Sequence, residues 1–158
     1  MKYKLPVLAV RDVEISKQFY HDLFDQQVTA DFGQCVTFSG GFAIQQGFDA
    51  LVGIPKSSVL YQSNNMQLYF EVEDFDTFAD KLYGFLDVEL VHPPKTYAWH
   101  QRAVCLYDPD WHMIEVGESM AVVVKRLLRA GNTVEQSAQM TQMPINFVEQ
   151  CKKGMEQI

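Results

Sequence analysis

Two stretches of the chain repeat one pattern of apolar and polar positions, at residues 8–24 and 70–86. Each begins as an alternating strand, passes through an aspartate (Asp12 or Asp74), and continues with apolar residues at helical spacing. Alternation predicts a strand with one buried face, and an aspartate side chain accepts hydrogen bonds from the first turn of a helix. The pattern therefore predicts two copies of a strand–helix unit.

Three strand-like runs, rich in β-branched and aromatic residues, follow each predicted helix. They span residues 28–32, 35–38 and 42–46 in the first copy, and residues 88–92, 102–107 and 112–116 in the second. We therefore predict an α+β fold of two βαβββ modules, at residues 1–47 and 66–118. Residues 48–65 contain Gly, Pro, Ser and Asn, which is typical of a linker. Such a linker permits closure within one chain or exchange of modules between two chains.

Residues 119–158 form a separate C-terminal extension with the pattern of three helices. A helix over residues 120–130 is followed by a capping box that begins at Thr133, and Pro144 opens a third helix. This spacing resembles a helix–turn–helix. The third helix contains only two lysines, however, and phosphate contacts normally require more basic residues. We therefore expect a helical extension that packs on the modules or on a second copy of the chain.

Composition narrows the class of protein. The chain has 158 residues, of which 47% are hydrophobic, so it can bury a substantial core. Its net charge of −7 argues against a nucleic-acid or anionic-membrane partner. There is no apolar run near the ~20 residues that span a bilayer and no signal-peptide pattern at the N-terminus. The three cysteines are widely spaced and odd in number, so they predict no disulfide framework. We expect reduced thiols in a cytoplasmic protein.

The segment at residues 102–118 carries the strongest chemical signal. An apolar strand runs into the turn residues Asp108, Pro109, Asp110 and Trp111, and a second strand then carries Glu115 in its middle. Pro109 suits a tight turn, which predicts a β-hairpin. A carboxylate in an apolar strand either faces solvent by alternation or needs a partner, because an unpaired buried charge is costly.

This hairpin resembles the last hairpin of the vicinal-oxygen-chelate superfamily, which includes glyoxalase I, bleomycin-resistance proteins, fosfomycin-resistance enzymes and extradiol dioxygenases. In that family a D-P-D/N-G-x-x-(I/L)-E segment delivers a metal-binding glutamate, which corresponds to Glu115; Trp111 stands where the family usually has Gly. The run from His92 to Arg102 also resembles an H-P-(x)n-W-G-Q-R run of uncharacterised bacterial members, with His100 in place of Gly. The resemblance implies a cup-shaped curved mixed sheet and, commonly, a homodimer.

The resemblance also implies four metal ligands, typically His, Glu, His and Glu, on the first and fourth strands of each module. The matching positions are Leu5, Gln45, Gln67 and Glu115. Leucine cannot bind a metal, and amide oxygens are poor ligands for Zn, Ni or Fe. We interpret the family metal site as degenerate and expect no cofactor. A site rebuilt from His92, His100 and Glu115 stays open as an alternative.

We expect a small-molecule pocket in place of the metal, because aromatic surface with a few polar groups is typical of ligand sites. Its expected residues are Gln45, Gln67, Tyr69, Tyr97, Trp99, Arg102 and Glu115. Core packing is the competing interpretation for Tyr69. Glu115 can pair with a cationic ligand group, act as a general base with His100 assisting, or be neutralised by Arg102 across the hairpin.

Two functions follow from this site. The missing metal ligands favour metal-independent binding of a small organic molecule, similar to the bleomycin-resistance branch. The retained glutamate favours a lyase, isomerase or dioxygenase-type enzyme that uses Glu115 as a base or a metal ligand. We favour binding, by a cytoplasmic homodimer without nucleic-acid or membrane partners.

Overall fold

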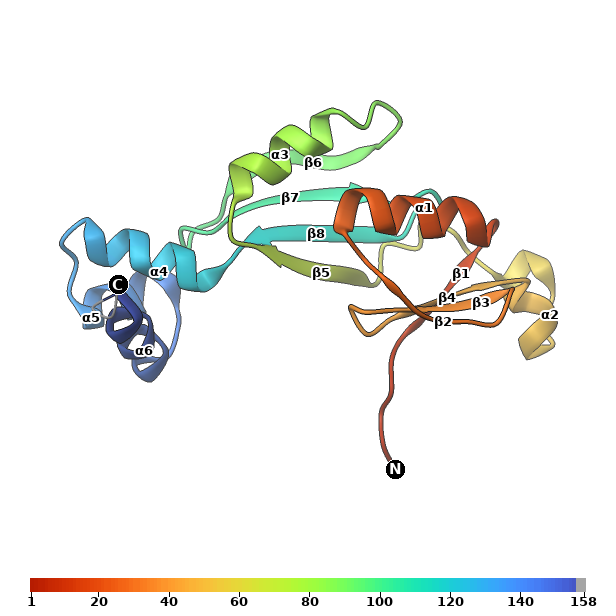
Figure 1. Cartoon of the computed structure of the whole chain (residues 1–158), viewed down its shortest axis with the longest axis horizontal. Helices are drawn as coiled ribbons and strands as arrows, with labels where there is room; N and C mark the ends of the chain where they lie inside the picture. Colours follow the sequence, from red (N-terminus) through yellow and green to blue (C-terminus); the bar gives the residue numbers. More distant parts are fainter. Residues whose placement is uncertain (156–158) are drawn as a thin grey trace. The chain divides into compact units, whose positions relative to one another are not determined.

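The computed structural model describes residues 1–155 and consists of two βαβββ modules followed by three helices (Figure 1). The α+β prediction is confirmed. The first module contains β1 (Val7–Val10), α1 (Val13–Phe24), β2 (Val28–Asp31), β3 (Cys35–Phe38) and β4 (Ala43–Gln46). The second contains β5 (Gln67–Val72), α3 (Phe75–Tyr83), β6 (Leu90–Thr96), β7 (Arg102–Tyr107) and β8 (Met113–Glu118). Between them lie α2 (Phe48–Val52) and a 3₁₀ turn, η1 (Lys56–Ser58).

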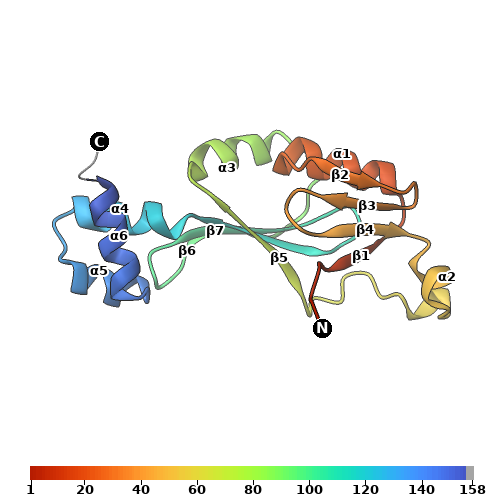
Figure 2. The same cartoon turned by 60° about the horizontal axis from the view of Figure 1, so that its bottom comes forward.

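Each module forms a mixed four-stranded sheet, and the strand orders match: β1-β4-β3-β2 in the first sheet (Figure 2) and β5-β8-β7-β6 in the second (Figure 1). In the first sheet β1 pairs parallel with β4, in a register that sets Ala9 opposite Gln45. The identical order confirms the internal repeat. The chain divides into two compact units: the first comprises residues 1–68, 85–89 and 106–114, and the second the rest. The turn end of the β7–β8 hairpin thus belongs with the first unit.

The helices of the two modules begin where the sequence predicts. The Asp12 carboxylate accepts hydrogen bonds from the backbone N–H groups of Glu14 and Ile15, and Asp74 accepts one from Thr77. These bonds satisfy N–H groups that have no partner within the helix. In the first unit α1 packs on β3 and β4 through Tyr20, whose ring contacts Phe38 and Phe42 at centroid distances of 5.5 and 4.9 Å. Phe42 is therefore a core residue.

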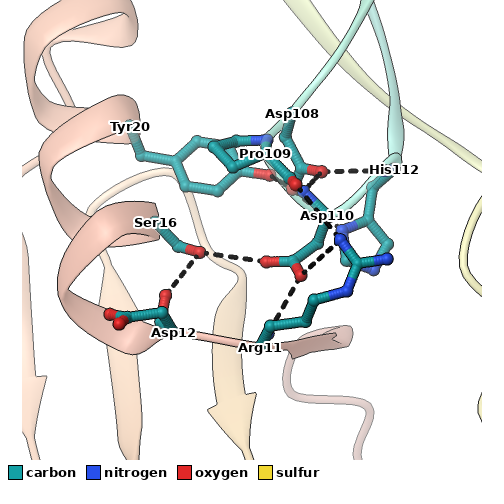
Figure 3. A network of polar contacts seen from close by, with 8 residues as sticks. All are labelled: Arg11, Asp12, Ser16, Tyr20, Asp108, Pro109, Asp110 and His112. Atoms are coloured by element: carbon teal, nitrogen blue, oxygen red, sulfur yellow. Dashed lines mark hydrogen bonds and ion pairs between the residues drawn. The ribbon is translucent and has the colours of Figure 1, made fainter.

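The buried turn of the β7–β8 hairpin is fastened to α1 by hydrogen bonds (Figure 3). Asp108 is 4% exposed and accepts from the Tyr20 hydroxyl at 2.8 Å, from the backbone N–H of Asp110 and from that of His112. The His112 ring nitrogen Nδ1 lies 2.8 Å from the same carboxylate. Burial, followed by the nearby Asp108 charge, raises the pKa of Tyr20 well above its ordinary value, so its hydroxyl stays a donor.

The second aspartate of the turn, Asp110, holds the start of α1. Its Oδ1 accepts from the backbone N–H of Arg11 at 2.9 Å, and its Oδ2 lies 3.3 Å from the Ser16 hydroxyl (Figure 3). The Arg11 guanidinium lies 3.6 Å from Asp110 Oδ1. Burial raises the pKa of Asp110, and the bond from the Arg11 backbone opposes that rise. Both aspartates of the turn motif are therefore structural residues.

Strand β6 shows the largest departure from its predicted bounds. The sequence predicts a strand that ends at His92, before two prolines, whereas β6 continues through Pro93 and Pro94 to Thr96. Proline has no N–H to donate to a neighbouring strand, so it is confined to sheet edges. The strand order places β6 at the edge of the second sheet, which explains how it accommodates both prolines.

The C-terminal extension forms three mutually packed helices, α4 (Met120–Arg129), α5 (Val134–Thr141) and α6 (Ile145–Met155). The predicted capping box at Thr133 and Gln136 is present. A core of Val124, Ala138, Val148 and Cys151 holds the helices together. None of the helices in residues 1–155 has the length and apolar character to cross a membrane.

Replacing Tyr20 with Phe should lower the free energy of unfolding by about 1.5–3 kcal/mol, because Asp108 loses a donor in a site that water does not reach. Urea denaturation monitored by circular dichroism measures the change. Tyr83→Phe is the matched control, since Tyr83 is 58% exposed. Equal midpoints for the two variants would show that the Tyr20–Asp108 bond contributes nothing to stability.

Candidate functional site

The two faces of strand β8 carry different groups: the candidate site lies on one face and structural ion pairs lie on the other. Side chains alternate between the two faces of a strand, so Glu115 and Gly117 share one face and Glu118 lies on the other. Hydrogen bonds agree with this division, because Glu115 accepts from Tyr97 whereas Glu118 accepts from Arg102. We call the face that carries Glu115 the glutamate face.

A pair of aromatic rings lies beside Glu115. The Tyr97 hydroxyl donates to Glu115 Oε2 at 3.0 Å, and the Tyr97 ring stacks on Trp99 with centroids 4.4 Å apart and planes inclined by 22°. The Lys95 ammonium lies 4.9 Å from the Tyr97 ring centroid. Tyr97, Trp99 and Glu115, three of the predicted site residues, are therefore gathered in one cluster within the second unit.

Gln101 extends this cluster toward β5. Its side chain is 4% exposed; Oε1 accepts from the Trp99 indole N–H at 2.8 Å, and Nε2 donates to the Tyr69 hydroxyl at 2.7 Å and to the Glu118 carbonyl at 2.8 Å. The Tyr69 hydroxyl in turn donates to Glu71 Oε1 at 3.0 Å. Tyr69 is 47% exposed, so the core-packing interpretation is wrong for it.

Gly117 makes room for this arrangement. A Cβ atom at residue 117 would lie 2.6 Å from Gln101 Nε2 and 2.8 Å from the Tyr69 hydroxyl oxygen, closer than such contacts normally come. Gln101, Glu71 and Gly117 were not predicted as site residues from the sequence. Gln101 had a signal, because it occupies the glutamine of the W-G-Q-R run that the segment resembles.

The two tyrosines act as hydrogen-bond donors over the ordinary pH range. Partial burial, together with the acceptor Glu71, raises the pKa of Tyr69 to about 12, and the Gln101 amide opposes this only in part. Burial and the hydrogen bond to Glu115 raise the pKa of Tyr97 to about 12. Both phenols therefore stay protonated while the carboxylates accept from them.

The loop between β6 and β7 adopts an unusual backbone at His100, where φ is +67°. Glycine reaches this left-handed region without steric penalty, which explains why the resembled run has Gly there. In this chain hydrogen bonds hold the loop: the His100 N–H donates to the Tyr97 carbonyl at 2.9 Å, and Arg126 of α4 donates to the His100 carbonyl at 2.8 Å. Trp111, the other residue that replaces a family Gly, has φ +68°.

Arg102 does not neutralise Glu115, and that expectation is wrong. Its guanidinium bonds Glu118 at 3.1 Å and Asp76 at 2.7 Å, on the face opposite Glu115, and lies over the Phe75 ring. Arg126 of α4 bonds the same Glu118 carboxylate. Alternation along β8 explains this, because residues 115 and 118 point to opposite faces.

Glu118 joins the extension to the second sheet. Its side chain is 1% exposed; burial raises its pKa, but the hydrogen bonds and charges of Arg102 and Arg126 outweigh burial, so the pKa is lowered overall. The Ser119 N–H also donates to the Val72 carbonyl, which ties the start of α4 to β5. The helical extension is thus anchored next to the Trp99 loop.

The other predicted ligand positions do not suit a transition metal. Leu5 precedes β1 and offers no donor atom. Gln45 is buried in β4 with Nε2 on the Gln46 carbonyl, and Gln67 is exposed at the start of β5. In residues 1–155 no three His, Cys, Asp or Glu side chains are grouped to hold an ion, so His92, His100 and Glu115 form no such group. A leucine and two amides at the resembled ligand positions are therefore not a suitable ligand set for Zn, Ni or Fe.

Comparisons with known proteins bear on the two modules. A family described as glyoxalase-like domain matches residues 3–121. A protein of unknown function from Agrobacterium tumefaciens str. C58 is 41% identical; the match covers 75% of this chain and 94% of that one, with a TM-score of 0.65. No curated protein matches the chain.

Two further solved structures share the fold at lower identity. The fosfomycin resistance protein FosX from Mesorhizobium loti is 22% identical, covers 75% of this chain and 92% of its own, and has a TM-score of 0.55. A glyoxalase/bleomycin resistance protein/dioxygenase family enzyme from Burkholderia phytofirmans PsJN is 17% identical, with 73% and 96% covered and a TM-score of 0.62. At this level of identity the two structures show that the fold is shared, and nothing more.

Replacing Glu118 with Gln should lower the free energy of unfolding by about 2 kcal/mol at pH 7, because two partly exposed arginines lose their carboxylate. A lowered pKa in the folded state contributes stability above the unfolded pKa of about 4.3, and this is lost as pH falls through the folded pKa. The difference between wild type and variant should therefore shrink below pH 4. Urea denaturation from pH 3 to 7 tests this; a pH-independent difference would contradict it.

Replacing Gly117 with Ala should lower the free energy of unfolding by about 1–3 kcal/mol, because the new methyl group displaces the Gln101–Tyr69 hydrogen bond. Gly154→Ala in α6 is the control: a Cβ there meets nothing within 4 Å, so stability should stay equal or rise by up to about 1 kcal/mol. Equal effects in the two variants would mean that Gln101 and Tyr69 move aside freely.

Proposed function

Because the chain belongs to the glyoxalase-like family of the glyoxalase/bleomycin resistance/dioxygenase superfamily, we propose that it binds a small organic molecule on the glutamate face. The observation that carries this proposal is the Tyr97–Glu115 hydrogen bond with Trp99 stacked behind it. Such a cluster offers aromatic surface and one oriented carboxylate. Ligand sites combine these two kinds of group.

The hydrogen bonds of the cluster indicate what the ligand carries. Glu115 Oε2 is engaged by Tyr97, and no residue among those described bonds its Oε1, which leaves one acceptor for a ligand. Glu71, which accepts from the Tyr69 hydroxyl, adds a second carboxylate to the cluster. Two carboxylates next to aromatic rings favour a ligand with an aromatic part and a cationic or donor-bearing group.

The proposed binding is independent of a metal. Support comes from the donor chemistry at the family ligand positions, where a leucine and two amides replace imidazole and carboxylate. Without a metal, the Glu115 carboxylate binds the ligand itself. The same carboxylate, within reach of a carbon acid, would be a general base, and the experiment below separates the two functions.

Replacing Glu115 with Gln should weaken binding of a cationic aromatic probe by about tenfold or more, because a charge-assisted hydrogen bond contributes about 1.5–3 kcal/mol. Calorimetric titration of tryptamine measures this, with the uncharged 3-ethylindole as the ligand control. Glu149→Gln on the exposed side of α6 is the protein control. Equal tryptamine affinity for wild type and the Glu115 variant would overturn the proposed role of Glu115.

Two further readouts accompany the titration. Elemental analysis of protein purified without chelators should show no metal that depends on Glu115; near-stoichiometric metal that disappears in Glu115→Gln would overturn metal-independent binding. Mass spectrometry should recover the probe unchanged. Conversion by wild type but not by Glu115→Gln would assign an enzyme instead.

A further inference from the structure

A cleft of about 290 Å³ lies next to the Trp99 loop within the second unit. Its walls come from two parts of the chain. Trp99 and Gln101 belong to the loop before β7, and the other lining residues belong to the helical extension: Met120, Thr141, Gln142 and Met143. The cleft is therefore a product of the extension.

We propose that this cleft is a second binding site, for a small uncharged molecule of one or two aromatic rings. None of its six lining residues is charged, which disfavours an ionic ligand. An indole and two thioethers offer polarizable apolar contacts, and sulfur–aromatic contacts are favourable. The cleft is open to solvent, and its volume of about 290 Å³ leaves room for one or two fused rings.

The loop wall of the cleft is held in place. The Trp99 N–H is bonded to Gln101, and Tyr97 stacks on one face of the indole, so the other face or the edge is what Trp99 offers to the cleft. Gln101 uses Oε1 and Nε2 within the protein. Arg126 fixes the loop to α4 through the His100 carbonyl. A wall ordered in advance loses little entropy when a ligand binds.

The helical wall is equally fixed. Thr141 is buried and its hydroxyl donates to the Ser137 carbonyl at 2.7 Å. Gln142 ends α5 with a left-handed backbone, φ +58°, and Met143 packs against the helical core. With Gln101 engaged, the exposed Gln142 amide is the polar group left for a ligand. One neutral hydrogen-bonding group on the ligand would match it.

The cleft differs from the glutamate face in charge, because Glu115 and Glu71 are not among its lining residues. The two sites share Trp99, which stacks on Tyr97 on one side and lines the cleft on the other. The proposal does not depend on the function proposed for Glu115. The two can fail separately.

Indole, which is uncharged, is the probe, and NMR of protein with ¹³C-labelled methionine methyl groups is the measurement. Saturable shifts at the Met120 and Met143 methyl groups are expected, caused by the ring current of the probe, while the signals of Met66 and Met113, in the first unit, stay unchanged. The same shifts should persist in Glu115→Gln. Loss of the shifts in that variant, or shifts at Met66 and Met113 alone, would overturn a separate site.

A variant tests the assignment independently. Met120→Ala should weaken indole binding about tenfold, since it removes a thioether from the wall at a helical position that tolerates alanine. Met140→Ala on α5, which does not line the cleft, should bind indole like wild type. Equal weakening in both variants, or none in either, would overturn the proposal. Unchanged thermal midpoints show that both variants are folded.

Discussion

The buried Asp108 carboxylate is the constraint on which the rest of this structure depends. It lies in a hairpin turn, yet its partner Tyr20 comes from a helix 88 positions earlier in the chain. A buried carboxylate is tolerable only when donors surround it, and Asp108 has them from Tyr20, Asp110 and His112. The D-P-D motif therefore fastens the last hairpin to the first helix.

Because side chains alternate along β8, the candidate site and the structural ion pairs lie on opposite faces of the strand. Glu115 lies on the face with Tyr97, and Glu118 lies on the face with Arg102. Two carboxylates three positions apart thus have different surroundings. Glu115 is partly exposed and accepts from Tyr97, whereas Glu118 is buried between two arginines and anchors helix α4. The anchor matters for the site, because Arg126 also holds the carbonyl of His100 in the loop that carries Trp99.

The departures from the resembled motifs have a common physical feature. His100 and Trp111 replace glycine, and both have positive φ. Left-handed backbone is unfavourable for these residues by roughly 1–2 kcal/mol, so surrounding bonds must hold it. The Trp111 N–H donates to the Asp108 carbonyl, and the Trp111 ring contacts Tyr107. At His100 the backbone N–H donates to the Tyr97 carbonyl, and the His100 carbonyl accepts from Arg126. In each case a larger side chain stands where the resembled motif has glycine.

Local and periodic features were readable from the sequence: the repeat, the aspartate caps, the hairpin and the capping box at Thr133 all depend on residues close together in the chain. Glu115, Tyr97 and Trp99 were named from two short motifs, and the structure places them in contact. Only the tertiary structure decided that β6 passes through Pro93 and Pro94 at a sheet edge, that Arg102 binds Glu118, and that the extension forms a cleft with Trp99. These outcomes depend on strand order, on the face to which a side chain points and on contacts across many residues, and no pattern along the chain encodes them locally.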